Sequence, residues 1–386
     1  MNPDSGVSRL ILIAILAFAF LFPAKSEAQQ FRGQFSLWGL AIQTPEESLE
    51  GQLGIRYLPE LQWKFAGTRG RRTDIAIAGN LYKTRTFSDS TSHHTRQSSE
   101  LYRAWARYTT RRFEVRFGLQ KINFGPAKLL RSLMWFDQLD PRDPLQFTRG
   151  VTGIRLRYDF PNLAGIWLWG LYGNGETKGM EFLPTEEETP ELGGRFQYPA
   201  GPGEIALTGH YRTTDPSLEP GLGLAGASVP EYRLALDGTW DVGIGLWFES
   251  ALIHADYSNE IFDWQSFGTV GADYTLPWGN GLYILGEHML VTISDAPYDP
   301  EEKIQNSGVM LSYPMGWLDN LAVYSIHNWD ASLTYHYLSW QRTYDRWVIH
   351  LGLYAIAGEG DFPVLAGQEV GTLGRRGVQL MLIFNH

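Results

Sequence analysis

The sequence predicts an all-β fold: a closed antiparallel transmembrane β-barrel of eighteen strands. From residue 29 to the end, segments of alternating polar and apolar residues are separated by turns, and these turns alternate between very short and long. In residues 231–241, one face carries Tyr232, Leu234, Leu236 and Trp240, and the other carries Glu231, Arg233, Asp237 and Asp241. Only helices and closed barrels satisfy their backbone hydrogen bonds inside a bilayer, so strands of this kind predict a barrel.

The first 28 residues predict a cleaved signal peptide. A short polar start that carries Arg9 is followed by the apolar run 10–22 and by small residues at Ser26 and Ala28. The apolar run is shorter than the roughly 20 residues that a spanning helix needs, which disfavours a membrane anchor. We therefore expect a signal peptide at 1–28 and a barrel at 29–386.

The composition argues against several classes of function. The chain has no cysteine, which excludes disulfides, thiolate metal sites and cysteine nucleophiles. A net charge of −10 without a basic tail disfavours nucleic-acid binding. No nucleophile with its base can be recognised, and His93 and His94 lie in a polar loop that we expect to be solvated. We expect no enzyme activity, no catalytic residues, no metal and no cofactor.

Turn signals and period-2 runs define the expected strands. Their even number is typical of a barrel with both chain ends on the periplasmic side. The reversal near 329–331 is the weakest of the turns, and without it the barrel would have sixteen strands. The eighteen expected strands are 31–42, 50–66, 72–86, 99–110, 112–124, 149–160, 163–174, 190–200, 203–214, 229–241, 242–256, 262–276, 280–293, 304–314, 317–329, 331–344, 346–358 and 371–385.

Loop lengths and aromatic residues orient the barrel. Connections after even-numbered strands are short, whereas long connections after odd-numbered strands include 87–98, 125–148, 175–189, 215–228, 294–303 and 359–370. Short periplasmic turns and long extracellular loops are typical of outer-membrane barrels. Aromatic residues such as Trp278 and Trp347 flank the short turns and predict a periplasmic girdle. Ordinary sheet propensity would explain these residues but not their positions.

The last strand resembles the C-terminal strand of bacterial outer-membrane barrels. In residues 375–384, Val378, Leu380, Leu382 and Phe384 share one face, and a basic residue and a glycine precede them. The resemblance implies that the barrel-assembly machinery recognises this strand.

The inward face of the strands carries the candidate site. A barrel of 16 to 18 strands leaves an aqueous channel, and arginine on the lipid side would cost roughly 2–4 kcal/mol at the midplane. In strand 99–110, Tyr102, Ala104, Ala106 and Tyr108 are expected to face lipid. The next strands place apolar residues on the same side. The residues expected to face inward on these three strands are Arg103, Arg107, Glu114, Arg116, Gln120, Arg155, Arg157 and Asp159.

The longest loop, 125–148, is expected to fold into the lumen. Its apolar residues, among them Trp135 and Phe136, would be costly to leave in water. Its acids Asp137, Asp140 and Asp143 would then face the arginines across a constriction and select solutes by charge. Alternatively, the arginines only neutralise inward acids such as Glu114 and Asp159, in a salt-bridge lattice without selectivity.

A local resemblance to the alginate-export-like porins surrounds this loop. It rests on the stretch 116–125, Arg-Phe-Gly-Leu-Gln-Lys-Ile-Asn-Phe-Gly, followed by Asp137, Asp140-Pro141 and Asp143-Pro144. The resemblance implies an eighteen-stranded barrel and a constriction role for Arg116, Gln120 and Lys121. It does not imply alginate as the substrate.

These patterns predict an outer-membrane channel for passive diffusion of small hydrophilic solutes. They leave the charge of the solutes open, with anionic solutes as one option. An export channel for an anionic polysaccharide and a structural or adhesive barrel with a blocked lumen are the alternatives. We expect the bacterial outer membrane as the location. The expected partners are its lipid and lipopolysaccharide, the assembly machinery and small solutes, without nucleic acid. The sequence does not determine the oligomeric state, and a homotrimer is one state that it allows.

Overall fold

The computed structural model describes residues 26–44, 48–67, 70–88, 94–140, 142–215, 228–256, 263–299, 301–358 and 375–386. The predicted signal peptide lies outside the described residues up to residue 25, and so do His93 and the predicted loop 359–370. Among the described residues, no helix is long and apolar enough to cross a membrane.

All eighteen predicted strands are present, and the reversal between Asn328 and Leu333 separates two of them, so eighteen rather than sixteen is confirmed. Their bounds are β1 Ser26–Gln43, β2 Leu49–Ala66, β3 Arg72–Ser88, β4 His94–Thr109, β5 Phe113–Gln120, β6 Val151–Asp159, β7 Gly165–Leu171, β8 Glu191–Ala200, β9 Gly203–Thr214, β10 Val229–Asp241, β11 Gly245–Ala255, β12 Trp264–Leu276, β13 Leu282–Ser294, β14 Glu302–Pro314, β15 Asp319–Asn328, β16 Leu333–Thr343, β17 Trp347–Ala357 and β18 Arg376–Asn385.

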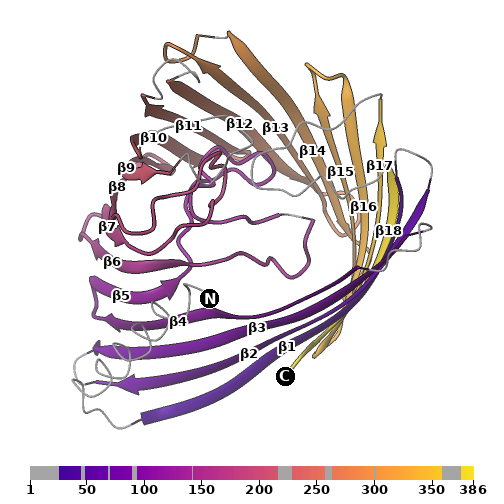
Figure 1. Ribbon diagram of the computed structural model, residues 1–386, viewed down its shortest axis with the longest axis horizontal. Helices are drawn as coiled ribbons and strands as arrows, with labels where there is room; N and C mark the ends of the chain where they lie inside the picture. The colour runs from indigo at the N-terminus through magenta and orange to yellow at the C-terminus, as the bar shows by residue number, and fades with distance from the viewer. Residues whose placement is uncertain are drawn as a thin grey trace.

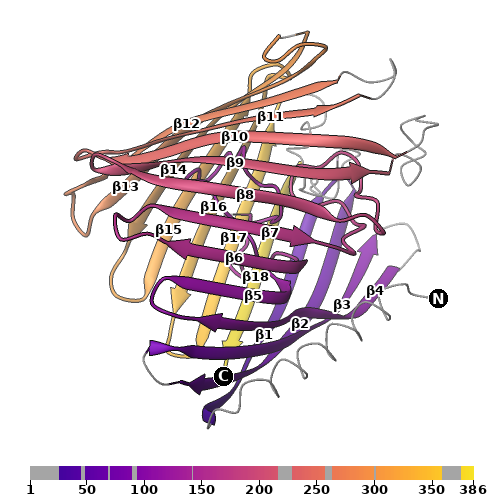
Figure 2. The same ribbon diagram turned by 90° about the vertical axis from the view of Figure 1, so that its left-hand side faces the viewer.

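The strands close into a single antiparallel barrel. Each strand pairs with the next along the chain, and β1 pairs with β18 from Gln34–Asn385 to Gln43–Arg376. Figure 1 looks into the barrel, and Figure 2 shows it from the side with β5–β9 in front. Closure leaves no unpaired sheet edge, which is the condition for crossing a bilayer with strands.

Burial alternates along the strands as the sequence predicts. On β10, Leu234 and Leu236 are 52% and 40% exposed on the outer face, whereas Ala235 and Asp237 are buried inside. Aromatic side chains beside the short turns are exposed as well, Trp278 and Trp347 among them. The outer surface is therefore an apolar band with aromatic residues at its periplasmic end, which suits a lipid environment.

One predicted orientation is wrong. The alternation places Tyr102 toward lipid, but its ring stacks on Phe147 of the long loop, with centroids 4.9 Å apart. The register between β3 and β4 shifts between Ala78 and Gly79, so β4 contains an additional residue at this level. An added residue moves the following side chains to the other face, and alternation alone does not predict it.

Candidate functional site

The segment between β5 and β6, residues 121–150, occupies the barrel interior (Figure 1). Its apolar residues belong to the largest buried cluster, together with inward side chains such as Phe267, Leu285 and Met289. This packing removes from water the apolar surface that would be costly to expose. We call residues 121–150 the lumen loop.

Two inward glutamates fix the first part of the lumen loop to the opposite wall. Glu249 of β11 accepts hydrogen bonds from the backbone N–H groups of Ala127 (2.9 Å) and Leu133 (3.0 Å). Glu287 of β13 accepts three more, from residues 128, 129 and 130, at 2.5–2.8 Å. The backbone N–H groups of an irregular segment have no neighbouring strand to accept their hydrogen bonds. Here two buried carboxylates accept them instead. We call Glu249 and Glu287 the clamp glutamates.

Side chains on the strand between them complete this attachment. Thr269 of β12 donates to the carbonyl of Leu130 at 2.7 Å and lies 2.7 Å from the hydroxyl of Ser132. Lys128 of the loop forms an ion pair with Asp273 and bonds the Tyr283 hydroxyl at 2.9 Å. Burial lowers the pKa of Lys128, but the bonds to Asp273 and Tyr283 outweigh it and raise that pKa overall. The loop is thus held by both backbone and side chain.

The rest of the lumen loop contacts the wall on the remaining sides. The Arg142 guanidinium lies 4.8 Å from the ring centroid of Tyr335 on β16. Leu145 packs in a cluster with Trp38 of β1 and Met381 and Ile383 of β18. Phe147 lies beneath the guanidinium of Arg56 on β2, 4.2 Å from its ring centroid. The loop therefore leaves the wall at β5, crosses to β11–β13, and returns past β16, β18 and β1 to β6.

The three acids of the lumen loop form their bonds within the loop. Asp137 pairs with Arg131, and Asp140 binds Arg142 through bonds of 2.6–3.0 Å. Asp143 accepts the backbone N–H groups of residues 145 and 147. Burial raises the pKa of Asp143, although these bonds and the charge of Arg56 oppose the rise. The described ion pairs thus join the loop acids to loop arginines, not to the arginines of the facing wall.

Inward arginines and acids on β3–β6 form a lattice, which we call the arginine wall. Asp74 of β3 is fully buried and accepts two bonds from Arg107, at 2.5 and 3.0 Å. Glu114 lies 2.6 Å from Arg155 and 3.4 Å from Arg116, and Asp159 binds Arg157 at 2.9 Å. The salt-bridge interpretation of the sequence is therefore correct for these pairs.

Positive charge nevertheless exceeds negative charge on the arginine wall. The inward arginines on β3–β6 are Arg72, Arg96, Arg103, Arg107, Arg116, Arg155 and Arg157, against the inward acids Asp74, Glu100, Glu114 and Asp159. In the described part of the chain Arg103 has no ion pair and donates only to the carbonyls of Tyr102 (2.5 Å) and Thr148 (2.8 Å).

Several buried donors of this wall bond no acceptor in the described structure. They are Nε of Arg116, Nε of Arg155 and the indole Nε1 of Trp167. The Arg155 guanidinium lies 5.3 Å from the Trp167 ring centroid, and that of Arg116 lies 4.8 Å from that of Trp105. Gln120 is buried and donates to two backbone carbonyls, so it holds the end of β5. Lys121 follows it and is half-buried.

A second inward segment, residues 172–190 between β7 and β8, supports the lumen loop. Its Glu181 binds Arg233 at 2.8 Å and Arg212 at 3.2 Å, and Arg212 also binds Glu231 at 2.6 Å. The backbone N–H of Met180 donates to the carbonyl of Met134 in the lumen loop at 2.9 Å. Strand parity could have identified Glu249, Glu287 and Arg233 as inward. No sequence signal shows which groups they bind.

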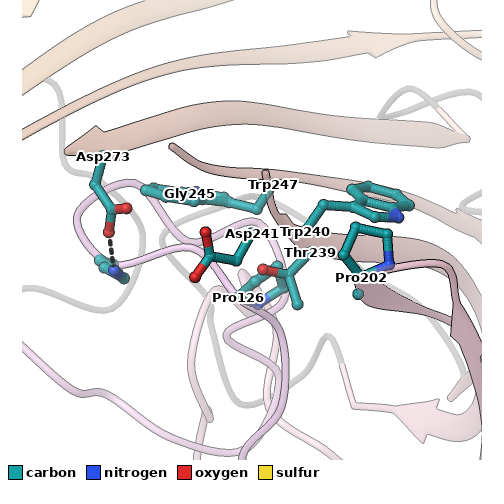
Figure 3. A pocket seen from close by; sticks show the side chains of 10 residues that line it. Pro126, Pro202, Thr239, Trp240, Asp241, Gly245, Trp247 and Asp273 are labelled. Carbon is teal, nitrogen blue, oxygen red and sulfur yellow. Dashed lines mark hydrogen bonds and ion pairs between the residues drawn. The ribbon is translucent and has the colours of Figure 1, made fainter. Parts of the chain in front are cut away.

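The lumen loop leaves space on the periplasmic side. A hollow of about 270 Å³ lies between Pro126 and Lys128 of the loop and the short turns of β9–β11, with Trp247 and Asp273 on its wall. Figure 3 shows its lining and the ion pair to Asp273.

No protein-family model and no curated protein matches the sequence. Solved structures share the fold over nearly the whole chain. They include an anion-selective porin from Comamonas acidovorans (12% identity, 93% of this chain and 99% of that one, TM-score 0.51) and Pseudomonas aeruginosa OccK5 (OpdH) (10%, 94% and 98%, 0.56). Acinetobacter baumannii OccAB1 is similar too (8%, 94% and 98%, 0.55). At these identities the similarity establishes a common barrel fold.

Proposed function

We propose that this chain is a bacterial outer-membrane channel for passive diffusion of small hydrophilic solutes, with a preference for anions. The observation that carries the proposal is the excess of arginine over acid on the inward face of β3–β6, at the level of the lumen loop. Fixed positive charge along a narrow aqueous path attracts anions and repels cations. The guanidinium side chains of Arg107, Arg116 and Arg155 are partly exposed and can donate to a passing carboxylate or phosphate.

The path is proposed to run between the lumen loop and the arginine wall. The loop begins and ends at this wall and contacts the other sides of the barrel. Side chains of Arg107 and Arg157 are 20% and 41% exposed, whereas the clamp glutamates are 1% and 4% exposed. Exposed charge can act on a solute, while charge buried against a backbone cannot.

The inward segments favour small solutes over a polymer. A polysaccharide exporter, which the resemblance to alginate-export-like porins would allow, needs a passage wide enough for a sugar chain. Here two inward segments contact each other through Met180 and Met134. If the inward segments closed the lumen completely, the barrel would conduct no ions. A conductance measurement therefore distinguishes a channel from a blocked barrel.

The test is single-channel conductance of the purified chain in planar bilayers. We expect discrete channels with a reversal potential on the anion side in a salt gradient. No conductance from the wild type, nor from a variant that lacks residues 127–140, would overturn the channel proposal. Since that deletion can impair folding, Glu249→Gln with Glu287→Gln is a milder way to loosen the loop.

Two matched variants test the role of net charge. Arg103→Gln removes an arginine without an ion pair, so we expect the reversal potential to shift toward zero. Asp74→Asn with Arg107→Gln removes the Arg107–Asp74 ion pair, together with the contacts of Asp74 to Arg72 and of Arg107 to Glu114. It leaves the net charge unchanged, so we expect anion preference to persist. Equal shifts in the two variants would show that the lattice, not the excess charge, sets the selectivity.

A further inference from the structure

The outward face of β3 changes from apolar to basic near its extracellular end. Successive outward positions are Ile75, Ile77, Gly79 and Leu81, followed by Lys83 and Arg85. Lys83 is the twelfth residue of β3, and a spanning strand uses about 9–11 residues. Its ammonium group therefore lies at the outer edge of the hydrocarbon, where lipid headgroups begin.

An apolar groove lies directly below these two cations. It measures about 440 Å³ and is lined by Phe35, Ile55, Tyr57 and Leu81, with Lys83 and Gln97 at its extracellular edge. The strand register fixes this order, because Phe35, Tyr57 and Leu81 are paired in one row and Ile55, Lys83 and Gln97 in the next. The lining residues come from four strands, β1–β4, that pair in this order. Of these, β1–β3 are 17–18 residues long and lie side by side in Figure 1.

The described residues include no acid partner for these two cations. Within the described residues, neither Lys83 nor Arg85 forms an ion pair, and the Arg85 guanidinium lies only against the Phe87 ring, 5.1 Å from its centroid. Both side chains are exposed. Exposed cations above an apolar groove at a membrane interface match a lipid with an anionic headgroup.

We infer that this surface binds a phosphorylated, acylated glycolipid of the outer leaflet, the lipid A part of lipopolysaccharide. One acyl chain lies along Phe35, Tyr57 and Leu81, and a phosphate group binds Lys83 and Arg85. The inference rests on the proposed location, since short turns must face the periplasm for this end of β3 to meet the outer leaflet.

The test measures binding of purified lipid A to the full-length barrel in detergent by native mass spectrometry. Each cation near an anionic headgroup contributes a factor of about five, so we expect Lys83→Gln with Arg85→Gln to weaken binding about 25-fold. The matched control is Arg96→Gln on β4, whose residue pairs with Thr84 on the inward face, and we expect it to bind as the wild type does.

Three outcomes would overturn the inference. They are equal binding by the double variant and the wild type, equal binding of dephosphorylated lipid A, or binding of phosphatidylglycerol as tight as that of lipid A. Conductance of the double variant is measured alongside. We expect it to be unchanged, so that failure of lipid binding and failure of the channel proposal give different results.

Discussion

The two sides of the lumen use inward charge in opposite ways. On β11–β13, the clamp glutamates are nearly fully buried, and their oxygens accept backbone N–H groups of the lumen loop. On β3–β6, arginines outnumber acids, and several guanidinium groups are partly exposed. Both sets of residues have the same inward parity in the sequence. The comparison teaches that inward parity alone does not decide how a charged side chain is used: the carboxylates of β11–β13 are buried against loop backbone, whereas the guanidinium groups of β3–β6 stay partly exposed even where they pair with acids.

The clamp side offers the largest expected effect. Glu287→Leu removes the acceptor of three backbone N–H groups and of the Trp247 indole. Leaving such donors buried and unpaired costs about 1–3 kcal/mol each where relaxation cannot restore a partner. We expect a loss of about 3 kcal/mol in the free energy of unfolding, and a larger, noisier conductance because the loop is released.

The matched control is Glu204→Leu. Glu204 is an inward acid of β9 and is not among the residues bonded to the lumen loop. We expect its conductance to match the wild type. Thermal unfolding and single-channel recording of the two variants check the prediction. Equal conductance in Glu287→Leu and the wild type would mean that the loop does not depend on the clamp.

The barrel can be predicted from the sequence because the features that specify it, alternation within a strand and the lengths of the loops, lie in short stretches of the chain. Alternation along residues 231–241 specifies which side chains meet lipid, and loop parity specifies the orientation. Even the weak reversal at Asn328–Leu333 can be recognised, since the strands on both sides keep their period. Alternation misplaces Tyr102 because a bulge depends on the partner strand, which the local pattern does not contain.

The interior can be predicted only in part. Parity puts Arg103, Arg107 and Arg155 inside, and apolar content draws attention to residues 125–148. The pairing does not follow from the sequence, because Asp137 binds its own loop neighbour Arg131 while Glu287 reaches across more than 150 residues to backbone groups. Irregular backbone has no period, so its partners are set by packing rather than by sequence spacing.

The second-largest expected effect is a loss of stability when the contact between the two inward segments is disturbed. Gly179 has φ of 53°, and a Cβ there would lie 1.7 Å from the carbonyl oxygen of Met134. Gly179→Ala should therefore push the support segment, residues 172–190, away from the lumen loop. The expected loss in the free energy of unfolding is about 2–3 kcal/mol, with a change in conductance.

Gly201→Ala supplies the control for that substitution. Gly201 has φ of 63°, but a Cβ there would meet no atom within 4 Å, so only backbone strain of about 1 kcal/mol is expected. Thermal unfolding of both variants measures the difference. Equal losses would show that the contact with Met134 adds nothing to stability.

The smallest expected effect is a pH dependence of anion preference that comes from Lys121, beside the arginine wall. Burial lowers the pKa of Lys121 below the ordinary lysine value of 10.5; attraction by Asp137 opposes this, and repulsion by Arg103 and Arg131 adds to it. The charge of Lys121 is lost as pH rises through this lowered pKa. Anion preference should therefore fall at a lower pH than an ordinary lysine would allow.

Reversal potentials from about pH 7 to 11, a range that brackets the ordinary lysine pKa, should show this step in the wild type and not in Lys121→Arg, which stays charged. Lys121→Met should begin with weaker anion preference and also lack the step. A step of equal size in Lys121→Arg would assign the titration to another group and leave the arginines as the sole source of selectivity.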